Sequence, residues 1–210
     1  MNICEIFYSI QGEGQLMGLP TVFIRTSGCN LRCNFCDTTY AYETGTQMSV
    51  KQILQKVEQY PCHRICLTGG EPLLQTESFH LLQKFHKQRY ALSIETNGSK
   101  DIHPLLLIPD VMISLDIKCP SSTMSEHMLM NNIFHLRSSD QIKCVVQTKK
   151  DYEFIKQIKQ QYHPSCEIYV QPAWNQIDLE TLAQWILDDG LDLRFGLQLH
   201  KYIFSEKKGC

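Results

Sequence analysis

The sequence contains no long hydrophobic run. No stretch approaches the roughly 20 apolar residues that a membrane-spanning helix needs, so we expect no membrane association. The N-terminal segment MNICEIFYSIQGEGQ has Glu5 where a secretory signal would need an unbroken apolar stretch after basic residues. Together these absences predict a cytoplasmic protein.

An excess of charge of one sign is also absent. The chain has 20 Lys and Arg residues against 22 Asp and Glu residues, a formal net charge of −2, and the basic residues are scattered among the acids. The basic stripe that marks a nucleic-acid-binding surface is therefore missing, and we expect no direct nucleic-acid partner. Such a charge balance is compatible with chemistry on a small molecule.

Repeats, low-complexity tracts and long Pro/Gly/Ser linkers are lacking as well. Hydrophobic residues make up 43% and charged residues 20% of the 210 residues, which is ordinary for a globular protein. The simplest organisation is therefore one domain over residues 1–210.

Cysteine, by contrast, is plentiful, with 10 residues. In a reducing compartment, clustered cysteines point to metal or redox chemistry more often than to disulfides. Cys4, Cys119, Cys144 and Cys166 lack a companion at metal-ligand spacing and are predicted to be small buried hydrophobes. Cys62 and Cys66 are near each other but run into an apolar strand, so burial is again expected and a second metal centre is the alternative. Cys210 lacks such a companion as well. The other three lie together in the segment GCNLRCNFCDT.

Short β-rich runs alternate with helical patterns along the chain. Ser49 can cap a helix with Val50, Ile53, Leu54 and Val57 on one face. Further helices are predicted over about 78–88, 125–136, 152–161 and 179–188, the last ended by Gly190. The candidate strands are Asn2–Phe7, Thr21–Thr26, Arg64–Thr68, Ala91–Glu95, Val111–Asp116, Gln141–Val146, Glu167–Gln171 and Leu193–Leu199.

This alternation predicts an α/β fold with parallel strands joined by right-handed crossovers. The strand count is nearer a barrel than an open sheet, but the chain is short for a full eight-fold barrel. We therefore predict a partial, splayed parallel β/α barrel. An open doubly wound sheet is the alternative that the pattern leaves open.

Unusual polar residues fall just after the predicted strands. Cys29 follows one strand, Gly69-Gly70-Glu71 another and Glu95-Thr96-Asn97-Gly98 a third. Asp116 and Lys118, then Gln171, then His200 close later strands. Because ligands bind at the carboxyl ends of the strands in parallel α/β folds, we expect a binding or catalytic site there.

Cys29, Cys33 and Cys36 form a C-x3-C-x2-C pattern. Three thiolates on one short loop can converge on a single inorganic centre, and an iron–sulfur cubane held by three of them has one iron left for an exogenous ligand. A zinc site completed by His63 or Cys62 is the alternative.

With Phe35 before the last cysteine, this pattern resembles the cysteine motif of radical S-adenosylmethionine (SAM) enzymes. The resemblance implies a [4Fe–4S] cluster whose open iron chelates the amino and carboxylate groups of SAM. It also implies that the reduced cluster splits SAM into methionine and a 5′-deoxyadenosyl radical, and that an electron donor such as flavodoxin serves the reaction.

A more specific similarity, to one family within this superfamily, extends over almost the whole chain. The segments FYSIQGEGQLMGLPTVFIRTSGCNLRCNFCDTTYAY, LTGGEPLLQ, IETNG, DIKCPSS, VQPAW and LRFGLQLHKY are similar, in this order, to the 7-carboxy-7-deazaguanine synthase family. The resemblance implies conversion of 6-carboxy-5,6,7,8-tetrahydropterin into 7-carboxy-7-deazaguanine. It implies further that hydrogen is taken from C6 of the pterin, that the ring contracts, that the hydrogen returns with loss of ammonia, and that SAM is regenerated. It also implies that Mg²⁺ assists and that the product enters queuosine-type 7-deazapurine biosynthesis, and a homodimer is the family expectation.

The resemblance also implies cofactor-binding positions. Glycines after a strand let the backbone approach the methionine end of SAM, and Glu71 can accept from its ammonium group; a plain turn with a solvated Glu71 is the alternative. Where the family has a Ser-Pro-Lys-like segment that contacts SAM, this chain has Asp116-Ile117-Lys118. The role of the lysine carries over to Lys118, but the role of the serine does not transfer directly to Asp116. The alternative for Asp116 and Lys118 is an ion pair at the end of the strand. The cofactor-binding residues implied are Phe35, Gly69, Gly70, Glu71, Asp116, Ile117, Lys118, Gln171, Pro172, Ala173 and Trp174.

For the substrate and for Mg²⁺ the family match implies a second set. Arg25 offers a planar fork for the pterin carboxylate, Gln11 offers donors and acceptors to its aminopyrimidine edge, and Glu13 can accept from amino groups or simply be solvated. Thr38 matches the Mg²⁺ ligand, and His200 is the catalytic candidate because it can neutralise a carboxylate or shuttle a proton. The substrate-binding residues implied are Ile10, Gln11, Gly12, Glu13, Arg25, Thr68, His200 and Cys210.

Two other functions share part of this pattern. A radical SAM activating enzyme that makes a glycyl radical on a partner protein would have the same cysteine loop and Gly-Gly-Glu. It would not require the pterin-facing segment Gln11–Glu13 before the cysteines. A zinc-stapled binding module without catalysis would have the cysteines alone.

Overall fold

The computed structural model describes residues 1–205, 207 and 209. Its centre is one curved sheet of nine strands in the order β3-β1-β2-β4-β5-β6-β7-β8-β9. The strands are β1 Asn2–Ile10, β2 Pro20–Thr26, β3 Thr46–Gln47, β4 Arg64–Gly69, β5 Ala91–Thr96, β6 Val111–Ile117, β7 Gln141–Val146, β8 Glu167–Pro172 and β9 Arg194–Phe195. From β2 to β9 every neighbouring pair is parallel. Because β3 and β9 are separate edges, the sheet is an open, partial barrel, which confirms the predicted fold class.

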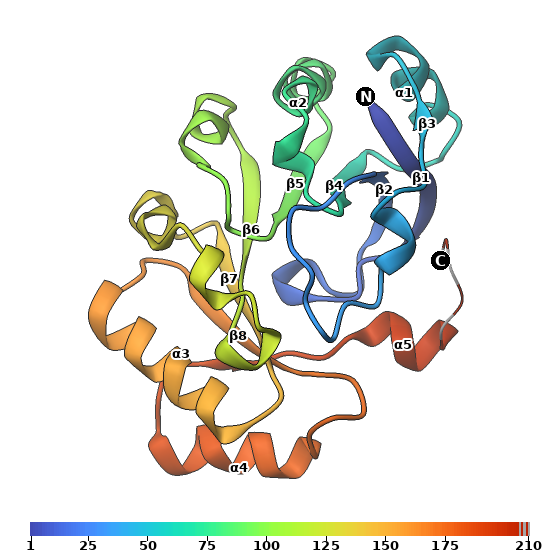
Figure 1. Ribbon diagram of the computed structural model, residues 1–210. Coiled ribbons are helices and arrows are strands. Elements are labelled where there is room, and N and C mark those ends of the chain that lie inside the picture. Colours follow the sequence, from blue (N-terminus) through green and yellow to red (C-terminus); the bar gives the residue numbers. More distant parts are fainter. Residues whose placement is uncertain (206, 208, 210) are drawn as a thin grey trace.

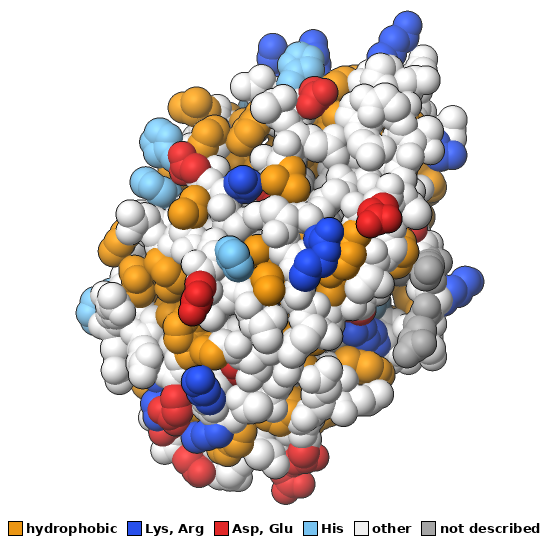
Figure 2. All heavy atoms as spheres, viewed as in Figure 1, with side chains coloured by type: hydrophobic (Ala, Val, Ile, Leu, Met, Phe, Trp, Pro, Cys, Tyr) orange, Lys and Arg blue, Asp and Glu red, His pale blue; other side chains and the backbone are white. Residues whose placement is uncertain are grey.

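Helices cover the outer side of the sheet (Figure 1). They are α1 Val50–Val57, α2 Glu77–Lys87, α3 Lys149–Tyr162 and α4 Leu179–Asp189, followed by the short α5 Leu199–Phe204 near the C-terminus. In Figure 1, α5 lies apart from the other helices, across the open side of the sheet. On the face seen in Figure 2, acidic and basic side chains are interspersed. Among the described residues, no helix has the length and apolar character to span a membrane.

Strand alternation separates the core from the site. Successive side chains of a strand point to opposite faces, and the outward set packs under the helices. It includes Ile24, Ile65, Ile94, Ile113, Ile142 and Ile168, all buried in one hydrophobic cluster with residues of α1 to α4. On the opposite, inner face six strands contribute polar residues near their carboxyl ends: Arg25, Thr68, Glu95, Asp116, Lys143 and Gln171. The same pattern of residues that builds the core therefore lines the inside of the barrel with polar groups.

The predicted start of the first helix is confirmed. Ser49 Oγ accepts from Gln52 N at 3.3 Å, and Gln52 Oε1 accepts from Ser49 N at 2.8 Å, which completes a capping box. Ile53 and Val57 are fully buried. At the other end of the chain, Gly190 ends α4 with a left-handed φ of 59°.

The cap of α1 gives a testable stability effect. Replacing Ser49 with Ala removes the acceptor for Gln52 N, and we expect the free energy of unfolding to fall by about 1 kcal/mol. Denaturant unfolding of the anaerobic protein measures this change. Ser49→Thr keeps the hydroxyl and should stay close to the native value; an equal loss in both variants would contradict the role of the cap.

Three predictions about the elements are wrong. The run Leu193–Leu199 is expected as a strand, but only Arg194–Phe195 pairs with β8, and Leu199 already begins α5. Residues 125–136 form no α-helix: two 3₁₀ segments, Ser125–His127 and Met130–His135, are separated by an extended Met128. The expectation of parallel strands fails at β1, which pairs antiparallel with β2, because the short connection over 11–19 has room for a hairpin and not for a crossover helix.

Candidate active site

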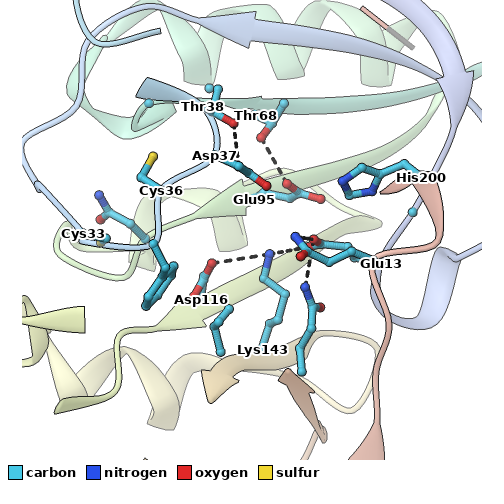
Figure 3. A pocket seen from close by; sticks show the side chains of 18 of the residues that line it. Glu13, Cys33, Cys36, Asp37, Thr38, Thr68, Glu95, Asp116, Lys143 and His200 are labelled. Atoms are coloured by element: carbon cyan, nitrogen blue, oxygen red, sulfur yellow. Dashed lines mark hydrogen bonds and ion pairs between the residues drawn. The ribbon is translucent and has the colours of Figure 1, made fainter. Parts of the chain in front are cut away.

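A cavity of about 260 Å³ opens on the inner face of the sheet, at the carboxyl ends of the strands (Figure 3). Residues from seven strands or their following loops line it, together with the cysteine loop and α5. Most residues expected from the sequence are among them: Ile10, Gln11, Gly12, Glu13, Arg25, Cys29, Cys33, Phe35, Cys36, Thr38, Thr68, Gly69, Gly70, Asp116, Lys118, Gln171, Ala173, Trp174 and His200. The structure thus brings the expected cofactor and substrate residues to one cavity.

Three expected residues of the described chain do not join this wall. Glu71 is fully buried behind it, and Ile117 belongs to the hydrophobic core. Pro172 lines a separate, smaller cavity beside Trp174. Strand parity explains Ile117 and Pro172, because each follows an inward residue and so points to the helical side. Cys210 lies outside the described residues.

The cysteine loop follows β2 and is held by backbone contacts. Gly28 N donates to Ala41 O at 2.8 Å, and Glu71 N donates to Gly28 O at 2.8 Å. A Cβ at Gly70 would collide with Gly28 O, so only glycine permits the two loops to lie this close. This contact binds the Gly-Gly-Glu turn to the loop that carries the three cysteines.

Cys29, Cys33 and Cys36 are free, partly exposed thiols on the cavity wall. Burial raises the pKa of Cys33 to about 11, although the charge of Lys118 acts against the rise. Soft thiolate donors on one loop fit an iron–sulfur cluster in type and in number for a three-ligand site. In the described part of the chain, no three His, Cys, Asp or Glu side chains are already gathered around one metal position.

Glu71 has a different environment from the one expected. Its carboxylate accepts from Leu73 N at 3.0 Å, Asn97 N at 2.7 Å and Thr96 Oγ1 at 2.8 Å. Burial raises its pKa, and these hydrogen bonds limit the rise. Since the carboxylate is buried and bound to three internal donors, Glu71 fixes the turn after β4 to the end of β5 and does not reach the cavity.

Asp116 and Lys118 form the strand-end ion pair that the sequence left open. Lys118 Nζ lies 2.9 Å from Asp116 Oδ2 and 5.7 Å from the Phe35 ring centroid. Asp116 Oδ1 and Gln171 Oε1 are buried on the cavity wall and have no hydrogen-bond partner among the described residues. A buried acceptor without a donor is costly. Both atoms therefore suit N–H or O–H donors of a bound molecule.

Glu95 joins the amide and hydroxyl groups expected for the substrate. Gln11 Nε2 donates to Glu95 Oε1 at 3.1 Å, and Thr68 Oγ1 donates to Glu95 Oε2 at 3.1 Å. Figure 3 shows Glu95 beside Thr68 in the cavity. From the sequence, Glu95 is expected at a strand end with no role assigned. Its inward position on β5, one residue after the outward Ile94, is the signal that could have assigned it to the site.

Glu13 is held inside the site and is not the free, solvated acceptor considered from the sequence. Lys143 Nζ lies 2.5 Å from Glu13 Oε2, while Gln171 Nε2 and Gln198 Nε2 each donate to Glu13 Oε1 at 2.9 Å. Burial opposes ionisation, but the charges of Lys143 and His200 hold the pKa of this carboxyl well below its usual range. Lys143 and Gln198 are functional-site residues that sequence reasoning missed.

Arg25 lies on the opposite wall, at the end of β2. Its Nε donates to Glu5 Oε1 at 2.7 Å, and its guanidinium lies 5.6 Å from the Phe7 ring centroid. Tyr40 Oη donates to the same Glu5 oxygen at 2.8 Å. Glu5 takes one of the five guanidinium N–H donors, so the fork is fixed in place and other donors remain for an anion in the cavity.

The C-terminal helix α5 forms a further part of the cavity wall. Leu199 N donates to Gly12 O at 2.9 Å, and a Cβ at Gly12 would collide with the His200 ring, so the glycine lets α5 pack on the N-terminal loop. Lys201 Nζ lies 2.8 Å from Asp37 Oδ2, and Thr38 Oγ1 donates to Asp37 Oδ1 at 2.9 Å. His200 therefore reaches the cavity from a helix and not from a strand end.

Comparison with known proteins agrees with this arrangement. The Radical SAM superfamily model matches residues 23–186. A 7-carboxy-7-deazaguanine synthase from Methanospirillum hungatei is 39% identical over 204 residues, which cover 97% of this chain and 85% of that protein. One from Thermoplasma acidophilum is 34% identical over 209 residues, which cover all of both chains.

Solved structures show the same fold. QueE from Escherichia coli superposes with a TM-score of 0.77 at 21% identity, over 95% of this chain and 94% of that chain. Part of SuiB from Streptococcus suis superposes with a TM-score of 0.61 at 15% identity, over 82% of this chain and 47% of that chain. A superfamily model that spans most of the sequence, and relatives of this identity along almost its whole length, place the chain in the 7-carboxy-7-deazaguanine synthase family of the radical SAM superfamily.

Proposed function

We propose that this chain is a carbon–nitrogen lyase that converts 6-carboxy-5,6,7,8-tetrahydropterin into 7-carboxy-7-deazaguanine with loss of ammonia, for 7-deazapurine biosynthesis. One observation carries the proposal: a single cavity is lined both by the three cysteines suited to an iron–sulfur cluster and by cationic and hydrogen-bonding side chains suited to a pterin. The full-length similarity to 7-carboxy-7-deazaguanine synthases supports the same reaction.

The family uses a [4Fe–4S] cluster and SAM, which together supply the radical chemistry that activates the substrate. Cys29, Cys33 and Cys36 would hold the cluster. Gly69 and Gly70 offer backbone beside that loop, and Phe35 and Lys118 border the same side of the cavity. On this side the buried oxygens Asp116 Oδ1 and Gln171 Oε1 can accept hydrogen bonds from N–H or O–H groups of SAM. Ala173 and Trp174 add an apolar surface suited to the same molecule.

The remaining wall suits the substrate. Arg25 presents guanidinium N–H groups to the pterin carboxylate, while Gln11, Thr68 and Glu95 present an amide, a hydroxyl and a carboxylate to its ring heteroatoms. His200 brings an imidazole against Gly12, where it can hold or move a proton during loss of ammonia. Helix α5 covers this side and keeps water from the reacting groups.

Five finer points are part of the proposal. Thr38 would bind Mg²⁺ through its hydroxyl oxygen only if substrate or water completes the octahedron, since one hydroxyl is a weak ligand. An electron donor such as flavodoxin, a homodimer and a cytoplasmic location are expected from the sequence resemblance. The chain is also proposed to act as one domain, which is consistent with its single continuous sheet.

Truncation of Arg25 tests the substrate wall. Arg25→Ala should raise KM for the pterin about 10- to 100-fold, because a charge-assisted hydrogen bond is worth roughly 1.5–3 kcal/mol, and should change kcat far less. Steady-state assays under anaerobic conditions measure both constants. Arg194→Ala, which removes an exposed arginine paired with Glu167 outside the cavity, is the matched control and should leave both unchanged. A native KM in Arg25→Ala would contradict this assignment.

Turnover distinguishes the proposal from its two rivals. The reconstituted protein is incubated with reductant, SAM, Mg²⁺ and either 6-carboxytetrahydropterin or a candidate glycyl-radical protein. We expect the deazaguanine product by mass and no radical on the protein partner. A glycyl radical without deazaguanine would identify an activating enzyme, and a colourless protein that binds zinc in place of iron would identify a zinc-stapled module.

A further inference from the structure

Lys143 is a buried ammonium in the centre of the site that the reaction described above does not use. It lies on β7 opposite Asp116 on β6 in the parallel register, and both side chains point inward. Its residue is 7% exposed. Full burial of a lysine is uncommon unless its charge is paired, so its partners indicate its purpose.

The ammonium joins two carboxylates (Figure 3). Nζ lies 2.5 Å from Glu13 Oε2 and 3.4 Å from Asp116 Oδ2. Asp116 has a second cation, Lys118, at 2.9 Å. Among the described residues, Lys143 supplies the one ammonium or guanidinium within ion-pair distance of Glu13. Loss of Lys143 would therefore leave Asp116 paired and Glu13 buried without its cation.

The contacts of Glu13 leave it little remaining capacity. An ionised carboxylate offers about four acceptor positions. Gln171 and Gln198 occupy two at Oε1, and Lys143 occupies one at Oε2. Since these three donors come from β8, from the residue before α5 and from β7, they fix the carboxylate through three separate elements. About one acceptor position is left unused by the described residues, and Glu13 lines the cavity.

We propose that Lys143 is a positioning residue for the substrate: it holds the Glu13 carboxylate ionised and fixed, so that its remaining acceptor position receives an N–H group of the pterin ring. This inference rests on the proposed function. It assigns recognition of the aminopyrimidine part of the substrate to Glu13 through Lys143, whereas Arg25 on the opposite wall faces the carboxylate.

The test compares Lys143→Met with Lys143→Arg in the reconstituted holoenzyme. Met keeps the length of the side chain without its charge, and Arg keeps the charge. KM and kcat for 6-carboxytetrahydropterin are measured from about pH 6 to pH 8.5. We expect Lys143→Met to raise KM about 10- to 100-fold with a smaller change in kcat, and Lys143→Arg to stay within about 3-fold of native.

The pH profile separates positioning from a structural role. Without Lys143, burial would raise the pKa of Glu13, so the Met variant should lose affinity increasingly as the pH falls, because a protonated Glu13 no longer accepts at that position. The other titratable groups near this pair are His200 on α5, Asp37 on the cysteine loop, Asp116 on β6 and Glu95 on β5. They are common to native enzyme and variant, so the difference between the two profiles reports Glu13.

A double-mutant cycle completes the experiment. With Glu13→Gln, the further change Lys143→Met should alter KM less than about 3-fold, because the carboxylate it serves is already neutral. Iron content after reconstitution should stay native in all variants, since none of the changed residues is a cluster cysteine. A native KM in Lys143→Met, a loss equal at every pH, or full additivity with Glu13→Gln would overturn the inference. If the native enzyme cleaved SAM but made no deazaguanine, the proposed function itself would fail, which is a distinct result.

Discussion

Replacing Cys33 with Ala is expected to abolish formation of the deazaguanine product. Cys33 is the middle member of the three-cysteine set on the cavity wall, and a cubane held by three protein thiolates loses one of its anchors when that thiolate is removed. We expect iron and sulfide content to fall after anaerobic reconstitution, the brown colour to fade and SAM cleavage to drop to background. Iron analysis, absorbance and product mass measure these effects.

The matched control is a cysteine away from the cavity. Cys62 precedes β4, and its thiol donates to Pro20 O at 3.3 Å. Cys62→Ser keeps this hydrogen bond, so iron content and turnover should stay within about twofold of native. Full turnover in Cys33→Ala, or equal losses of iron in both variants, would contradict the assignment of the cluster to Cys29, Cys33 and Cys36.

Replacing Glu71 with Ala is expected to lower the free energy of unfolding by about 3–5 kcal/mol, because its removal leaves three internal donors, from Leu73, Thr96 and Asn97, without their acceptor. Such a loss is a large fraction of the stability of an ordinary domain. Denaturant unfolding under anaerobic conditions, without added SAM, measures it.

Glu77→Ala is the control for Glu71→Ala, since Glu77 is an exposed acid in the first turn of α2 and its replacement should change the free energy of unfolding far less. Glu71→Gln keeps one acceptor oxygen and should fall between the two. The structural role of Glu71 would be refuted if Glu71→Ala retained native stability and lost only its affinity for SAM. That outcome would favour the ammonium contact that the resemblance first implied.

The buried parallel strands were predictable from sequence. The bounds of β4, β5, β6, β7 and β8 agree with the predicted runs to within a residue at each end. These strands read as continuous β-rich runs because both of their faces are covered. Asp116 and Gln171 were expected at strand ends and Thr68 from the family resemblance; strand alternation explains why all three face the cavity.

The edges of the sheet were less predictable because tertiary contacts decide them. The run Leu193–Leu199 has the composition of a strand, yet its pairing with β8 ends at Gly196, whose N donates to Val170 O. The chain then turns towards the N-terminal loop, where Leu199 N donates to Gly12 O. In residues 125–136, Asn132 donates to Gly98 O and Lys100 O, so the segment serves the loop after β5 and does not form a helix. Neither partner is near in sequence.

The site was predictable where a local motif exists and incomplete where partners come from distant strands. The cysteine spacing and the Gly-Gly-Glu turn are local patterns, and both lead to the cavity wall or to the loop behind it. Lys143 belongs to no motif, and Glu95 belongs to the segment IETNG but had no role assigned to it. Their signal is a charged residue at an inward position between apolar neighbours, which becomes informative only when the sheet face is known.

The most direct test of the central claim is turnover with limiting SAM. The claim is that the three-cysteine cluster and SAM serve as a regenerated radical source for ring contraction of the pterin. With excess 6-carboxytetrahydropterin and reductant, the reconstituted protein should form several molecules of 7-carboxy-7-deazaguanine for each molecule of SAM supplied. Consumption of SAM to 5′-deoxyadenosine with no deazaguanine product would contradict it.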